Sequence, residues 1–95
     1  MRNEITVDAL GDDRFLVRTR QDDDVVEVLV RASPAVLARF TDDEVDEVRV
    51  VQASFAYLIA RQRPDDLPSQ LDLDDVLATY EDFEDDVRRR LHGPM

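Results

Sequence analysis

The sequence contains no cysteine, lysine or tryptophan, and it has only two glycines and one histidine. The lack of cysteine excludes disulfide bonds, thiolate nucleophiles and cysteine-based zinc sites. The glycines, Gly11 and Gly93, stand alone, so the chain has no glycine-rich loop that could bind phosphate groups. His92 has no second histidine or cysteine with which to share a transition metal. We expect it to be a solvent-exposed residue at the end of a helix.

Basic residues are also scarce. Twelve arginines stand against 23 acidic residues, which gives a net charge of −11 over 95 residues. At long range such a chain repels nucleic-acid backbones and anionic lipids, so neither direct nucleic-acid binding nor membrane binding is expected. No apolar run approaches the roughly 18 residues of a membrane span. We expect a protein of the prokaryotic cytoplasm, whose acidity reflects either codon usage in a GC-rich genome, the simpler explanation, or a high-salt cytoplasm.

The chain length predicts one small acidic domain over residues 1–95, with a single modest core. The first third alternates apolar and polar residues in three segments, 4–10, 14–20 and 25–31, as antiparallel strands do. Turn-forming residues separate these segments, at Gly11-Asp12-Asp13 and again at 21–24. The sequence therefore predicts a three-stranded antiparallel β-meander.

The turn lengths also predict how the strands pair. A three-residue loop at 11–13 places Leu10 opposite Arg14, and a four-residue loop at 21–24 places Arg20 opposite Val25. Both hairpins then bring apolar residues together on one face, in the pairs Ala9–Phe15, Val7–Val17, Ile5–Thr19, Thr19–Val26, Val17–Val28 and Phe15–Val30. The other face gains two pairs of opposite charge, Glu4–Arg20 and Arg18–Glu27.

The remainder of the chain predicts helices at 34–39, 42–62 and 72–91. Ser33-Pro34 is a typical helix start, with serine as N-cap and proline at the first helical position. Thr41-Asp42-Asp43-Glu44 has the spacing of a capping box, and it predicts that the long central helix begins at 42. The apolar residues of the last segment keep a helical period, although a break near Glu81-Asp82 would give two short helices instead.

The expected fold class is therefore α+β, with the helices packed on one face of a three-stranded sheet. Such a sheet has two free edges and an outer face without a cover. On that outer face Leu16 lies opposite Leu29, and Leu10 lies near them at a strand end. Arg14 lies opposite Arg31, which is unfavourable unless an anion or a partner's carboxylate lies between them. These five residues are our interface candidates.

Catalytic and metal sites are not indicated. The acidic residues follow turns and helix exteriors, and no pattern brings two carboxylates into one cleft, where acid–base catalysis needs them. The aspartate clusters lack the glycine and the terminal glutamate of an EF-hand loop. Arg88-Arg89-Arg90 follows Glu84-Asp85-Asp86, so this basic run is expected to pair within its own helix. We predict no enzyme activity, no cofactor and no bound metal.

One stretch resembles a pattern in small bacterial α+β proteins of unknown function. It comprises residues 51–61, VQASFAYLIAR, followed by Leu71-Asp72-Leu73, Val76 and Tyr80. In that pattern an SFxYL-type helix precedes LDLxxV and an aromatic residue, and it covers about a third of this chain. Where those proteins typically have a proline and a second aromatic residue, this chain has Glu81-Asp82-Phe83. The resemblance implies a fold and no activity.

Two functions fit these features. The first is a non-enzymatic protein–protein interaction module that forms a homodimer, or binds another protein, through its sheet. The alternative is an acidic regulator that mimics nucleic acid and occupies a groove of a basic partner protein, as the net charge suggests. Carboxylates scattered evenly over the surface would count against the alternative.

Overall fold

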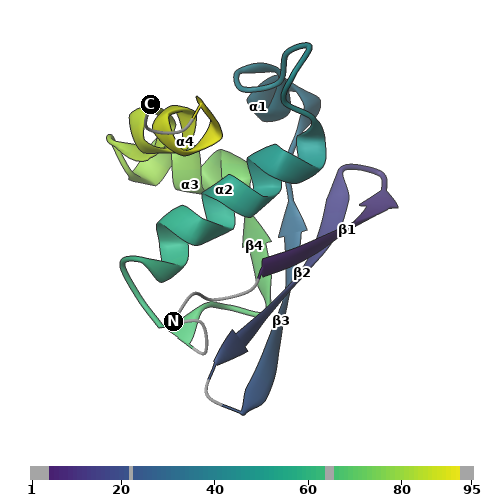
Figure 1. Ribbon diagram of the computed structural model, residues 1–95, viewed down its shortest axis with the longest axis vertical. Helices are drawn as coiled ribbons and strands as arrows, with labels where there is room; N and C mark the ends of the chain where they lie inside the picture. The colour runs from purple at the N-terminus through teal and green to yellow at the C-terminus, as the bar shows by residue number, and fades with distance from the viewer. Residues whose placement is uncertain (1–4, 22, 64–65, 93–95) are drawn as a thin grey trace.

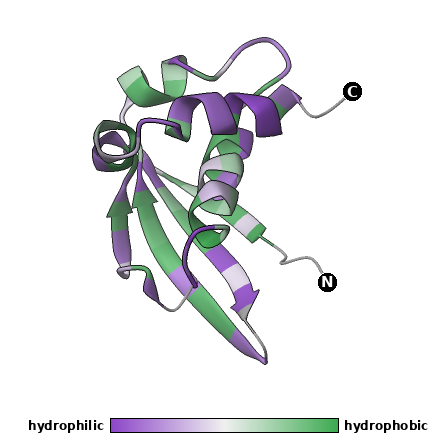
Figure 2. Ribbon diagram, turned by 90° about the vertical axis from the view of Figure 1, so that its left-hand side faces the viewer, coloured by the Kyte–Doolittle hydropathy of each residue, from purple (hydrophilic) through white to green (hydrophobic). Residues whose placement is uncertain are grey.

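The structure, a computed structural model, describes residues 5–21, 23–63 and 66–92. It has the α+β fold that the sequence predicts, with a fourth strand added to the sheet (Figure 1). The sheet has the order β1-β2-β3-β4, and the helices gather on one side of it (Figures 1 and 2). In chain order the elements are β1 (Ile5–Gly11), β2 (Arg14–Gln21), β3 (Asp24–Arg31), α1 (Pro34–Ala38), α2 (Glu47–Ile59), β4 (Gln70–Asp72), α3 (Leu73–Thr79) and α4 (Phe83–His92).

The predicted register of the meander is confirmed. All six apolar pairs form as expected, and Arg20 lies opposite Val25. On the opposite face, the Arg18 guanidinium donates to the Glu27 carboxylate at 2.7 Å. The expected partner of Arg20 across β1, Glu4, lies outside the described residues. A slip of one residue would have turned every core side chain toward solvent, which is why the alternation defines the register so strongly.

The first turn differs from the prediction at Leu10. Gly11, and not Leu10, lies opposite Arg14, and the register shifts between Ala9 and Gly11. Asp12 and Asp13 both have positive φ, 54° and 65°, as in the two-residue turns whose twist suits a hairpin. The shorter turn leaves Leu10 as an extra residue in β1, a β-bulge that pairs with nothing and is 52% exposed.

The fourth strand corrects the prediction of a three-stranded sheet and moves one of its two edges. Residues 70–72 pair in parallel with the end of β3, in the register Leu29–Gln70, Val30–Leu71 and Arg31–Asp72. The Leu29 amide also donates to the Ser69 carbonyl at 2.9 Å. Three residues are too few to show a strand period in a sequence, and a parallel partner lies far away in the chain. The open edges of the described sheet are β1 on one side and, on the other, β4 together with the first half of β3.

The predicted capping box is wrong. The long helix α2 begins at Glu47, and its N-cap is Asp46, whose carboxylate accepts from the Arg49 amide at 2.9 Å. Residues 42–45 form a turn instead, in which the Asp42 carboxylate accepts from the amides of Glu44 and Val45. This turn brings Val45 into the core at 2% exposure. Burial of the Val45 side chain therefore outweighs the predicted capping box at Thr41.

The C-terminal segment is broken, as the alternative reading of the sequence allowed. Helix α3 ends at Thr79, and Tyr80 is extended with φ −109° and ψ 117°. Helix α4 then starts at Phe83, which is fully buried. The short helix α1 confirms its prediction, since the Ser33 hydroxyl accepts from the Val36 amide and Pro34 follows it.

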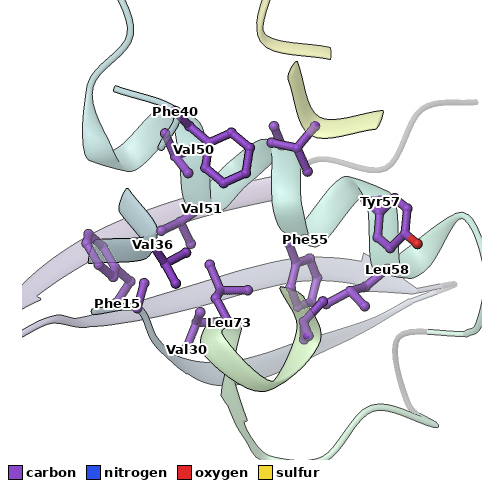
Figure 3. Packing of buried hydrophobic residues seen from close by; sticks show 14 of the residues in the cluster. Phe15, Val30, Val36, Phe40, Val50, Val51, Phe55, Tyr57, Leu58 and Leu73 are labelled. Carbon is purple, nitrogen blue, oxygen red and sulfur yellow. The ribbon is translucent and has the colours of Figure 1, made fainter. Parts of the chain in front are cut away.

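The core lies between α2 and the inner face of the sheet, and the other helices close it (Figure 3). Phe15 and Val30 project from the strands, Val51 and Phe55 from α2, and Val36 from α1 (Figure 3). Thr19 is the exception on this face. It is 2% exposed, and no described group lies within hydrogen-bond distance of its Oγ1 atom. A buried hydroxyl without a partner costs on the order of 1–3 kcal/mol, so this end of the core is not optimised for stability.

Candidate functional site

The outer face of the sheet is the surface that no described helix covers (Figures 1 and 2). Leu16 and Leu29 form a cross-strand pair at its centre, and both are half-buried. Leu10 lies in the bulge of β1 and is exposed. The structure therefore brings two of the three predicted leucines together and leaves the third at their margin, because the bulge shifts it out of register.

Arg14 and Arg31 lie directly opposite each other next to the leucines, as predicted. The only described carboxylate near Arg14 is that of Asp12 in the adjacent turn, at 3.8 Å, and both side chains of that pair are largely exposed. No described carboxylate lies within 4 Å of the Arg31 guanidinium. Arg31 therefore has no ion pair within 4 Å in the described chain, and Arg14 has only the exposed pair with Asp12.

Charge on the outer face differs from charge on the rest of the molecule. Among the described residues, the strand register places four arginines and three acidic residues there, namely Arg14, Arg18, Arg20 and Arg31 with Asp8, Glu27 and Asp72. The whole chain, by contrast, has a net charge of −11. The outer face is thus close to neutral. Another acidic protein therefore meets less electrostatic repulsion at this face than at the rest of the surface.

A hollow of about 450 Å³ lies on the outer face where β3 meets β4. Arg14 and Arg31 line one part of it, while Asp72 and Asp75 line another. One carboxylate oxygen of Asp72 accepts from the Asp74 amide at 2.9 Å as the N-cap of α3, which orients the side chain. Sequence reasoning missed both acidic residues. They reach the sheet only through β4, for which the sequence holds no clear signal.

A second hollow, of about 360 Å³, lies between the start of β1, α2 and α4. Its polar groups are already used by the chain itself. Arg49 donates to the Leu91 carbonyl at 3.2 Å, and Gln52 donates to the Ile5 carbonyl at 3.0 Å. Arg90 binds the Asp86 carboxylate at 2.5 Å. These contacts join α2 to β1 and α4, so this hollow reflects packing between elements.

A cluster of polar contacts joins α2 to the turn before α4. The Tyr57 hydroxyl donates to the Asp82 carboxylate at 2.6 Å, and Arg61 binds the other oxygen of the same carboxylate. The Arg61 guanidinium also lies over the Tyr57 ring, 4.2 Å from its centroid. The hydrogen bond from Tyr57 and the charge of Arg61 lower the pKa of Asp82. Burial, followed by the hydrogen bond to Asp82, raises the pKa of Tyr57.

Replacing Tyr57 by phenylalanine is expected to lower the free energy of unfolding at neutral pH by about 1 kcal/mol, since one hydrogen bond to a carboxylate is lost. The lowered pKa of Asp82 means that its contribution to stability is present above the unfolded-state pKa of about 4 and is lost as the pH falls further. The difference between the variant and wild type should therefore shrink below pH 4. Urea titrations at pH 7 and pH 3 test this, and an unchanged difference at pH 3 would show that the carboxylate is not involved.

Within the described residues, no group of three or more histidine, aspartate or glutamate side chains is placed to hold a metal ion. No helix in that part of the chain is long and apolar enough to cross a membrane. The outer face, with its leucine pair, its arginine pair and the hollow beside them, is the candidate site. Comparison with models of protein families, with curated proteins and with solved structures found no match, so the resemblance noted from the sequence stays a prediction.

Proposed function

We propose that this protein is a small non-enzymatic interaction module that self-associates through the outer face of its sheet. The observation that carries the proposal is the Leu16–Leu29 pair, which lies across neighbouring strands on a face that no described element covers. Charged side chains surround this pair, in the arrangement of an interface centre with a polar rim. Leu10, 52% exposed, is a further exposed apolar side chain on β1.

The near-neutral charge of the outer face supports self-association. Two copies of a chain with a net charge of −11 repel each other over most possible contacts. Contacts between two outer faces are the exception, because arginine and acidic side chains are present there in similar number. Two copies are therefore expected to associate through their outer faces.

The alternative, an acidic mimic of nucleic acid, is less well supported because several carboxylates are used inside the molecule. Glu84 binds both Arg39, at 3.2 Å, and Arg88, at 2.7 Å. Asp74 accepts from the Ser33 hydroxyl at 2.8 Å. A mimic needs carboxylates that are free to meet the cations of a partner, so these contacts favour the interaction module.

The proposal predicts that wild-type protein is a dimer at micromolar concentration and that Leu16→Glu or Leu29→Glu makes it monomeric. A glutamate at either position places a charge at the centre of the interface, where its desolvation is costly. Light scattering coupled to size exclusion measures the mass. Ala60→Glu is the matched control, since it adds the same charge at an exposed position at the end of α2. A protein that stays dimeric with both leucines replaced would contradict the proposal.

A further inference from the structure

The hollow on the outer face carries two kinds of charge that do not meet. Arg14 and Arg31 come from β2 and β3, whereas Asp72 and Asp75 come from β4 and the first turn of α3. The register places Arg31 directly beside Asp72, with Arg14 beyond it. Among the described ion pairs, none within 4 Å joins either arginine to either of these acidic residues. The hollow is therefore polarised, with cations on one side and anions on the other.

The backbone elements fix where these four charged side chains begin. Asp72 is held as the N-cap of α3 by its bond to the Asp74 amide, and Asp75 lies in the first helical turn, where an acidic side chain is favoured. The arginines belong to two strands that are paired along their whole length. Within the described part of the fold, these four side chains make two polar contacts. One is the cap at Asp72, and the other is the exposed ion pair between Arg14 and Asp12.

A surface polarised in this way is complementary to itself. Rotation about a twofold axis lying between two facing sheets and parallel to their strands exchanges the two sides of the hollow. The arginine side of each copy then faces the acidic side of the other, and each ion pair forms twice. A simple anion fits less well, because the carboxylates at the far side repel it.

We propose that Arg14 and Arg31 of one copy pair with Asp72 and Asp75 of a second copy, so that the hollow sets the orientation of the dimer. This inference rests on the proposed function, since it names the polar contacts of the same outer face. The Leu16–Leu29 pair lies beside these charges, and Leu29 itself lines the hollow. The apolar contact supplies affinity, and the charges choose the orientation.

The test uses two single variants, Arg31→Glu and Asp75→Arg. In a twofold contact each variant places like charges opposite each other at two symmetric positions. Each should weaken self-association by about tenfold. In a mixture of the two, the introduced glutamate of one chain meets the introduced arginine of the other, while the native Arg31 and Asp75 meet at the symmetric position. The mixture should therefore form heterodimers when neither variant forms homodimers.

Native mass spectrometry separates the three dimers by mass, and sedimentation equilibrium gives their dissociation constants. Arg89→Glu and Asp85→Arg are the matched controls. Both side chains are exposed on α4, on the side of the sheet away from the outer face, and Asp85 lies in the first turn of α4 as Asp75 does in α3. Both controls should dimerise like wild type, and circular dichroism checks that every variant is folded.

Heterodimers that form selectively in the mixture support the inference, because an ion pair within one chain cannot produce them. Variants that dimerise like wild type, or a mixture without heterodimers, overturn it. If Leu16→Glu still abolishes the dimer in that case, the proposed function stands and only the orientation is wrong. A wild-type protein that is monomeric throughout overturns both.

Discussion

Replacing Phe83 by alanine is expected to lower the free energy of unfolding by about 4 kcal/mol, a large effect for a single side chain. Phe83 is fully buried at the first position of α4. Its ring lies edge-to-face against Tyr57, with centroids 5.2 Å apart, and against Phe40, at 6.1 Å. The substitution removes both aromatic contacts and leaves a cavity where the segment before α2, α2 itself and α4 meet.

A loss of this size is a large part of the roughly 5–15 kcal/mol that stabilises a typical domain. Urea titration should show a lower midpoint with an unchanged slope, because the native state stays as compact as before. Phe83→Leu is the control, since it keeps most of the apolar volume and should cost about 1–1.5 kcal/mol. An alanine variant within about 1 kcal/mol of wild type would mean that Phe83 is not at the centre of the core.

Replacing Leu73 by alanine is the second large change, with an expected cost of about 3 kcal/mol. Leu73 is 1% exposed and follows Asp72 directly, so its side chain anchors the junction between β4 and α3. A cavity beneath this junction should loosen β4 from β3. The Leu29 amide, which donates to the Ser69 carbonyl, should then exchange its hydrogen faster than in wild type.

Leu77 provides a matched control for Leu73. It lies one turn further along α3 and is only half-buried, so alanine at this position should cost clearly less than at Leu73. Unfolding in urea, followed by circular dichroism, measures both variants. If the two substitutions cost the same, or if exchange at Leu29 is unchanged, β4 does not depend on the Leu73 anchor.

The meander shows how much of the strand pairing local sequence patterns predict. Strict alternation from Ile5 onward and the positions of the two turns were sufficient to place Val17 opposite both Val7 and Val28. The same count also placed Leu16 opposite Leu29 and Arg14 opposite Arg31, which are four of the five predicted interface residues. The fifth, Leu10, was misplaced by one position because the turn at Asp12 and Asp13 is shorter than its composition indicates.

The helices show where local patterns compete. The capping box at Thr41 and Glu44 predicted a helix start at 42, and Asp46 was not predicted as an N-cap. The structure uses Asp46 as the N-cap, and Val45 and Phe40 are both buried in the segment before it. In the last segment the helical period left open either a continuous helix or a break near Glu81-Asp82, and the structure has the break at 80–82, where Tyr57 and Arg61 bind Asp82.

The sequence by itself determined the α+β class, the strands and their register, because alternation and turn length act between residues that are close in the chain. Only the tertiary structure decided that β4 joins β3 and that Asp72 and Asp75 lie beside Arg14 and Arg31. Those contacts join segments about forty residues apart, as the Ser33–Asp74 hydrogen bond also does. Their formation depends on the packing of α2 and Leu73 against the sheet, which no local pattern encodes.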